Sequence, residues 1–203
     1  MRTLKLLAIA LLGCGGGAGE APEEALKEAP ATSEPPSAKV SGKDAPWPTF
    51  RGNMERTGAL SPVTLLRQPK LLWRFDTGGK VESSPTVWNG RLFVGSFNEH
   101  LFALDATTGR ELWRFPVGAL VRASPSVVNG NVFFGADDDR FYALDAVSGE
   151  ERWRYELGPG GEQSSPAIFG ERVIFGAFDH HVYALHTDTG ELLWRAATGG
   201  GIL

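Results

Sequence analysis

The chain has 203 residues, of which 42% are hydrophobic, so it is long enough to bury the core of one domain. Its single cysteine excludes an intrachain disulfide, and its formal net charge of −4 argues against a nucleic-acid partner.

The first residues have the pattern of a secretion signal. Two basic residues precede the apolar run Leu6–Leu12, which is too short to span a bilayer. Cys14 follows at once in the sequence LLGC, which resembles a bacterial lipobox, where cleavage before the cysteine precedes its lipidation. We therefore expect a lipoprotein signal peptide at 1–13 and a membrane anchor on Cys14. The glycine that follows resembles sorting signals for the outer membrane, facing the periplasm, in an organism that has one. A buried or incidental cysteine is the alternative.

A flexible linker is expected at residues 14–46. Residues 15–46 contain no aromatic residue and are rich in glycine, alanine, proline and glutamate. Such a stretch cannot bury enough apolar surface to offset the entropy of ordering. As a coil, its ends would lie roughly 30 Å apart. The alternative is a docking peptide for a partner.

From residue 47 to 203 the sequence is dominated by a repeat of about 40 residues. The tryptophans 73, 113, 153 and 194 lie 40, 40 and 41 residues apart, and a Ser-Pro pair and a glycine keep the same spacing. The one-residue insertion falls in the stretch GPGGEQ, which predicts a surface loop there. A period of this length indicates one supersecondary unit per repeat.

Each repeat divides into four short strands. In the first these are TVW, RLFVG, LFALD and ELWRF, separated by Asn89-Gly90, FNEH and DATTG. Asn-Gly between apolar runs is typical of a two-residue hairpin turn; Asn129-Gly130 repeats it, and Gly170 keeps the glycine. The runs RLFVG, NVFFG and RVIFG are apolar on both strand faces, so we expect neighbours on both sides.

These features predict an all-β protein made of propeller blades, each a four-stranded antiparallel sheet. Three blades are expected, at about 81–116, 121–156 and 162–196, with an extra N-terminal outer strand around Trp73. Propellers use about four to eight blades, so three cannot close a ring. We therefore expect an incomplete propeller, with truncation or self-assembly into a larger ring as the two explanations.

The phrase ALDATTGRELW, which returns in each repeat, is interpreted as scaffolding. Asp105 opens a turn, Gly109 takes a backbone shape that a side chain would penalise, and Trp113 fills the gap between blades beside the small Ala103. Catalysis rarely needs the same group three times. The other copies supply the residues Ala143, Asp145, Gly149 and Trp153, then Ala184, Gly190 and Trp194, with His186 in place of the aspartate.

The pattern A-x-D-x-x-x-G-x-x-x-W resembles the tryptophan-docking motif of PQQ-like β-propeller repeats. The segment WPTFRGNMERTG, residues 47–58, is similar to the one that enters the propeller in many members. That family includes quinoprotein dehydrogenases and non-catalytic lipoproteins that scaffold outer-membrane β-barrel assembly. WD-repeat propellers share the period, but here arginine rather than aspartate follows each of the four tryptophans.

One face of the blades is the candidate binding surface, because the loop before each inner strand and the second hairpin lie on the same side. It carries the residues Glu82, Arg122, Gln163, Asp137, Asp138, Asp139, His180 and His181. The acidic run lacks the spaced ligands of a calcium loop, and adjacent histidines on a strand point to opposite faces. We therefore expect no metal site there.

The resemblance implies that an enzyme of the family would hold PQQ with adjacent cysteines, a stacking tryptophan and calcium. Adjacent cysteines are absent here. We expect a non-catalytic, lipid-anchored extracytoplasmic module without PQQ or calcium, whose partners are other envelope proteins and the membrane. A fragment of a PQQ-dependent dehydrogenase and a sensor of a small ligand are the alternatives.

Overall fold

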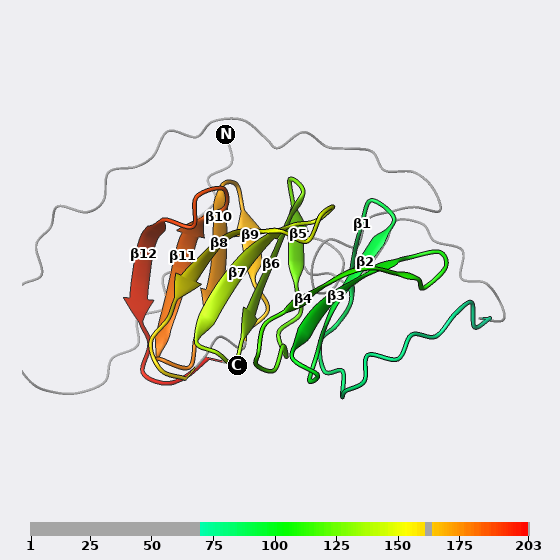
Figure 1. Ribbon diagram of the computed structural model, residues 1–203. Helices are drawn as coiled ribbons and strands as arrows, with labels where there is room; N and C mark the ends of the chain where they lie inside the picture. Colours follow the sequence, from blue (N-terminus) through cyan, green and yellow to red (C-terminus); the bar gives the residue numbers. More distant parts are fainter. Residues whose placement is uncertain (1–69, 161–163, 203) are drawn as a thin grey trace, which may run out of the picture. The chain divides into compact units, whose positions relative to one another are not determined.

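The computed structural model describes residues 70–160 and 164–202. All regular structure in these residues is β: three antiparallel sheets of four strands, each in chain order (Figure 1). The predicted all-β propeller fold is confirmed. Within the described ranges, no helix is long and apolar enough to cross a membrane. The signal peptide, Cys14, the linker, residues 47–58 and Gln163 lie outside the described residues.

Each sheet forms one blade. Blade 1 consists of β1 (Thr86–Trp88), β2 (Arg91–Ser96), β3 (His100–Asp105) and β4 (Glu111–Pro116). Blade 2 consists of β5 (Ser126–Val128), β6 (Asn131–Ala136), β7 (Arg140–Asp145) and β8 (Glu151–Glu156). Blade 3 consists of β9 (Ala167–Phe169), β10 (Arg172–Gly176), β11 (His181–His186) and β12 (Leu192–Ala197).

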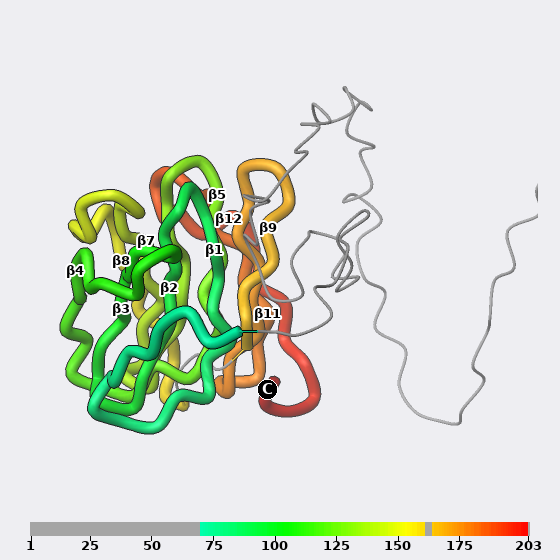
Figure 2. Tube along the Cα trace, turned by 90° about the vertical axis from the view of Figure 1, so that its right-hand side faces the viewer, coloured from blue at the N-terminus to red at the C-terminus, as the bar shows by residue number. Residues whose placement is uncertain are grey.

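The inner strands β1, β5 and β9 lie side by side in chain order (Figure 2). Hydrogen bonds from the Ser-Pro segments join them. The Ser84 N–H donates to Ser124 Oγ at 2.9 Å, and the Thr86 hydroxyl donates to the Pro125 carbonyl at 2.5 Å. Ser126 repeats the second bond to the Pro166 carbonyl at 2.7 Å. The Ser-Pro spacing therefore reflects contacts from one blade to the next.

Apolar side chains fill the space between adjacent blades. Phe93 and Leu101 of blade 1 and Phe134 of blade 2 are fully buried in one cluster. Phe141 of blade 2 stacks on Phe175 of blade 3 in the next, with ring centroids 3.9 Å apart. The middle blade is covered on both faces, which explains strands that are apolar on both sides.

The first two hairpins have the turns that Asn-Gly predicts. Asn89 and Gly90 have φ values of 45° and 72°, and both values must be positive in a type I′ turn. The third hairpin differs, because Phe169 pairs with Arg172 and the loop is Gly170-Glu171. Gly170, with φ 58°, therefore stands first in the turn, the position of asparagine in the other hairpins. Glycine first is the pattern of a type II′ turn.

The extra outer strand expected around Trp73 is not formed. Residues 70–77 pair with no other strand in the described chain, so they carry no strand assignment. A strand needs a hydrogen-bonded neighbour, and the outermost sheet on this side begins with blade 1. Trp73 nevertheless packs on blade 1, with Phe75, against Phe102.

Candidate functional site

Trp113 and Trp153 each connect their blade to the following one, and Trp73 connects the segment before blade 1 to blade 1, whereas Trp194 is 43% exposed and contacts no following blade among the described residues. Trp153 of blade 2 lies against Gly190 of blade 3, and its indole N–H donates to the Thr187 carbonyl at 3.0 Å. Trp73 packs on Gly109 in the same way, and its indole N–H donates to the Ala106 carbonyl, three residues before that glycine, also at 3.0 Å. Three of the four tryptophans and the glycines Gly109, Gly149 and Gly190 therefore form contacts at successive junctions.

Glycine is required at these contacts for two reasons. Gly149 has φ +77°, which penalises any side chain, and a Cβ there would lie 2.7 Å from the Trp113 ring. The tryptophan in turn is aimed by a β-bulge. Ala103 pairs with Trp113 and Leu104 with Glu111, which leaves one extra residue on β4. The same register shift recurs in blades 2 and 3.

The motif aspartates hold the turn that carries the glycine. Asp145 Oδ1 accepts the N–H groups of Val147 and Ser148, each at 2.8 Å. The hydrogen bond from the Ser148 N–H is the main cause that lowers the pKa of Asp145 to about 2, and a hydrogen bond from the Arg152 side chain is the second. Backbone and hydroxyl donation from the equivalent threonine likewise lowers the pKa of Asp105. In blade 3, His186 Nδ1 accepts one N–H in the same turn, so the scaffold survives the replacement.

The loop face assembles most of the predicted residues, but each carboxylate has its own local partner. Asp137 Oδ2, on the turn between β6 and β7, lies 2.8 Å from Nε of Arg122, on the loop that enters blade 2. Asp139 Oδ1 accepts the Gly160 N–H at 2.9 Å. Asp138 accepts a hydrogen bond from the Tyr142 hydroxyl.

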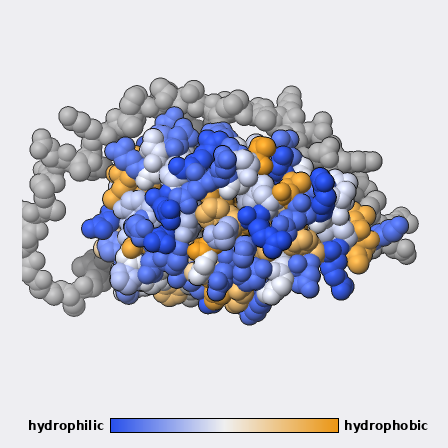
Figure 3. Space-filling model, in the orientation of Figure 1, coloured by the Kyte–Doolittle hydropathy of each residue, from blue (hydrophilic) through white to orange (hydrophobic). Residues whose placement is uncertain are grey.

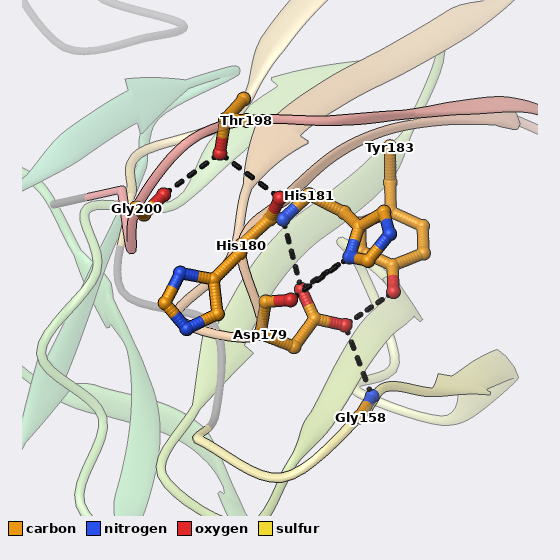
Figure 4. A network of polar contacts seen from close by, with 7 residues as sticks. All are labelled: Gly158, Asp179, His180, His181, Tyr183, Thr198 and Gly200. Atoms are coloured by element: carbon orange, nitrogen blue, oxygen red, sulfur yellow. Dashed lines mark hydrogen bonds and ion pairs between the residues drawn. The ribbon is translucent and has the colours of Figure 1, made fainter.

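The matching position in blade 3 is Asp179, at the centre of Figure 4. Its side chain accepts the Tyr183 hydroxyl, the Gly158 N–H at 3.2 Å and the His181 N–H at 3.2 Å. Burial first, and then the bond to Asp179, raise the pKa of Tyr183 to about 12. Tyr142 has a pKa of about 12 for the same reasons, with Asp138 as its partner. These tyrosines therefore act as neutral donors that fix the turn.

The two adjacent histidines point away from each other (Figure 4). The His181 ring nitrogen Nδ1 lies 2.9 Å from the Asp179 carbonyl oxygen, whereas His180 is exposed on the other side of the turn. Among the described residues, no three histidine, cysteine, aspartate or glutamate side chains converge as metal ligands.

A cluster at the junction of blades 1 and 2 brings together three predicted residues, Glu82, Arg122 and Asp137, with Lys80 and Phe97, which the sequence reasoning missed. The Phe97 ring is in contact with two cations: the guanidinium carbon of Arg122 lies 4.9 Å and Lys80 Nζ lies 5.5 Å from its centroid. Lys80 also donates to Glu82 and lowers the pKa of that carboxylate. We call Lys80, Glu82, Phe97, Arg122 and Asp137 the Phe97 cluster. Phenylalanine recurs at this turn position in blade 3, as Phe178, and this repeat could have shown that aromatic groups belong to the face.

A family model described as outer membrane protein assembly factor BamB (PQQ_2) matches residues 61–201. The chain belongs to this family. The resemblance drawn from the tryptophan motif is therefore confirmed. Among curated proteins, no sequence matches the chain.

Solved structures with the same fold include proteins of both kinds that the motif suggested. BamB from Moraxella catarrhalis is 23% identical, with a TM-score of 0.56, covering 62% of this chain and 39% of that one. Quinohemoprotein alcohol dehydrogenase from Comamonas testosteroni is 24% identical (TM-score 0.67), covering 75% and 27%. A europium-containing methanol dehydrogenase is 22% identical (TM-score 0.65), covering 78% and 33%. The chain thus spans less than two fifths of each of these proteins, and the likeness shows the fold alone.

On the described part of the loop face, no three histidine, cysteine, aspartate or glutamate side chains gather as ligands for the metal ion that the resemblance associates with a quinone. The carboxylates of Asp137, Asp138 and Asp139 on one turn and of Asp179 on another each accept hydrogen bonds from separate local donors. The chain's one cysteine rules out a clamp of adjacent cysteines within these 203 residues. We therefore derive no chemical step through such a cofactor.

Proposed function

We propose that the protein is a non-catalytic β-propeller module that binds other proteins of the cell envelope. It is anchored by lipid on Cys14, on the extracytoplasmic side, at the outer membrane facing the periplasm in an organism that has one. The family match and the sequence LLGC support this location. The repeated residues support the non-catalytic role, because they serve the packing of one blade on the next rather than a reaction.

The Phe97 cluster is the observation that carries the binding role. A partly exposed phenylalanine ring lies in contact with Arg122 and Lys80, and aromatic residues and arginine are enriched in protein interfaces. The cluster lies on the loop face, away from the tryptophan contacts. Its charged groups have both signs, which favours a partner surface that is polar at its rim and apolar at its centre.

The test compares variants on opposite ends of the blades. Phe97→Ala removes the central ring, and Phe169→Ala is the control, because Phe169 is 68% exposed at the hairpin on the other end. Chains carrying an affinity tag would be incubated with detergent-solubilised envelope from the source cells. We expect one partner species to be retained by the wild type and by Phe169→Ala. Loss of a central interface residue costs about 2 kcal/mol or more, so Phe97→Ala should retain at least roughly tenfold less.

Equal retention by Phe97→Ala and the wild type would contradict the binding role of the cluster. The anchor is tested separately by metabolic labelling with a radioactive fatty acid. The wild type should incorporate the label and Cys14→Ser should not. A label that persists in Cys14→Ser would contradict anchoring at that residue.

A further inference from the structure

We propose that the partner presents a basic surface to the loop face, with lysine and arginine side chains around an apolar or aromatic group that packs on Phe97. This inference rests on the proposed function, because it names the chemistry of the partner that the Phe97 cluster binds. In the described chain the loop face comprises residues 76–85, the turn between the second and third strands of each blade, the connections between blades, and the strand residues that border them.

The negative charge of the described chain is concentrated on this face. Residues 70–160 and 164–202 contain sixteen aspartates and glutamates, and eight of them lie on the loop face. Only three of the twelve lysines and arginines lie there, whereas the rest of the described chain has eight carboxylates and nine cations. The carboxylates of the face are Asp76, Glu82, Glu99, Asp137, Asp138, Asp139, Glu156 and Asp179, and its cations are Lys80, Arg122 and Arg140. A basic surface is therefore attracted to this face rather than to the remainder of the blades.

Each cation of the loop face is already paired with a carboxylate. Lys80 lies 2.5 Å from Glu82, and Arg122 lies 2.8 Å from Asp137. Arg140 contacts two carboxylates, at 2.9 Å and 3.4 Å. An acidic partner would therefore meet cations whose charge is already compensated, so charge complementarity favours a basic partner.

Half of the carboxylates, in contrast, have no lysine or arginine as a partner among the described residues. Asp139 accepts the Gly160 N–H at 2.9 Å. Asp179 accepts the Gly158 N–H at 3.2 Å, and the Glu99 side chain is exposed. Neutral donors fix a carboxylate in position without cancelling its charge, so these groups present a fixed negative potential to a partner. The four are Asp76, Glu99, Asp139 and Asp179.

Phe97 supplies the apolar part of the contact. Its ring is partly exposed, and interfaces place aromatic residues at an apolar centre inside a polar rim. The side of the blades on which the outer strands β4 and β8 lie is mainly hydrophilic, and its hydrophobic residues form small separate patches (Figure 3). The loop face joins an aromatic ring to an excess of negative charge, and a partner with an apolar group among lysines and arginines complements both.

The test reverses the charge of two exposed glutamates at opposite ends of the blades. Glu99→Lys changes the loop face, and Glu150→Lys makes the same change on the turn between β7 and β8. Neither glutamate side chain takes part in a hydrogen bond or ion pair among the described residues, so both variants should keep the circular dichroism of the wild type. Retention of the partner from detergent-solubilised envelope is then compared at low and high salt.

We expect Glu99→Lys to retain roughly threefold to tenfold less partner than the wild type at low salt, and Glu150→Lys to retain the same amount as the wild type. The difference should shrink as the salt rises from about 0.01 M to about 1 M, because the Debye length falls from about 30 Å to about 3 Å.

A defined probe tests the same chemistry without the natural partner. It is a synthetic peptide with two lysines on each side of a Leu-Phe pair, added to the isotope-labelled full chain in mild detergent. Nuclear magnetic resonance should show saturable shifts at Phe97 and Glu99. The same peptide with glutamate in place of lysine should bind at least roughly tenfold more weakly, as expected when like charges meet across an interface.

Equal retention by Glu99→Lys and the wild type at low salt would overturn the basic partner, as would equal or tighter binding of the glutamate peptide. Shifts of the loop face that depend on protein concentration without peptide would identify a second copy as the occupant and would also overturn it. If Phe97→Ala still lost the partner in these cases, the proposed function would stand and only the charge of the partner would be wrong. Retention that Phe97→Ala leaves unchanged would contradict the proposed function itself.

Discussion

The indole N–H of Trp153 should contribute measurable stability, and a neighbouring tryptophan supplies the control. This N–H donates to the carbonyl of Thr187, a residue that is almost fully buried. Trp113 occupies the same position one blade earlier, but its Nε1 is buried and has no hydrogen-bond partner among the described residues. Phenylalanine at either position loses part of the ring, but only Trp153→Phe loses a hydrogen bond.

The expected difference in the free energy of unfolding between the two variants follows from this one hydrogen bond. The loss of ring volume is common to both variants, because each ring lies beside a phenylalanine of its own blade, with centroids 5.7 Å and 5.8 Å apart. The hydrogen bond adds about 0.5–1.5 kcal/mol, and more if the carbonyl is left buried and unpaired. With a urea slope of about 1–3 kcal/mol per molar, 1 kcal/mol moves the midpoint by roughly 0.3–1 M.

The assay is urea unfolding of Trp153→Phe and Trp113→Phe, each compared with the wild type by circular dichroism. We expect Trp153→Phe to unfold at the lower urea concentration. Equal midpoints, or a lower midpoint for Trp113→Phe, would refute the argument that the indole hydrogen bond separates the two positions.

Two further predictions concern the same motif. Gly149→Ala places a methyl group 2.7 Å from the Trp113 ring. It should cost about 1–3 kcal/mol more than Gly90→Ala, because Gly90 has a similar positive φ (+72° against +77°) but no atom within 4 Å of an added Cβ. Thermal unfolding measures both losses, and equal losses would contradict the steric argument. The Ser148 N–H is the main cause that holds the pKa of Asp145 at about 2 in the folded chain, below the value of 3.8 for an unperturbed aspartate. Its carboxylate therefore stabilises the fold fully above pH 3.8, and this stabilisation is lost as the pH falls toward 2. The difference in unfolding free energy between the wild type and Asp145→Asn should therefore shrink from pH 6 to pH 2, and a constant difference would contradict this assignment.

The fold could be predicted from the sequence because one period repeats in several independent residues. Trp113, Gly149 and the Ser-Pro pairs recur together, and each contributes to a contact between adjacent blades. A residue that serves every junction leaves a regular trace in the sequence. The Asn-Gly turns were predictable for a local reason, since few residues tolerate two positive φ values in succession.

The rest depends on neighbours that a single repeat does not reveal. Trp73 fits the period, but its segment forms no strand, because pairing needs a partner sheet. Gly170 was expected to keep the hairpin glycine, yet it stands one position earlier in its turn. Phe97 becomes a candidate for binding only when Arg122, from the loop before blade 2, stacks on it.

The docking of each tryptophan on the glycine of the next blade is the central claim, and proton NMR tests it most directly. The α protons of Gly109, Gly149 and Gly190 should be shifted upfield by the ring currents of Trp73, Trp113 and Trp153, with nuclear Overhauser contacts to those rings. Glycine α protons at ordinary shifts, without contacts to any indole, would contradict the account.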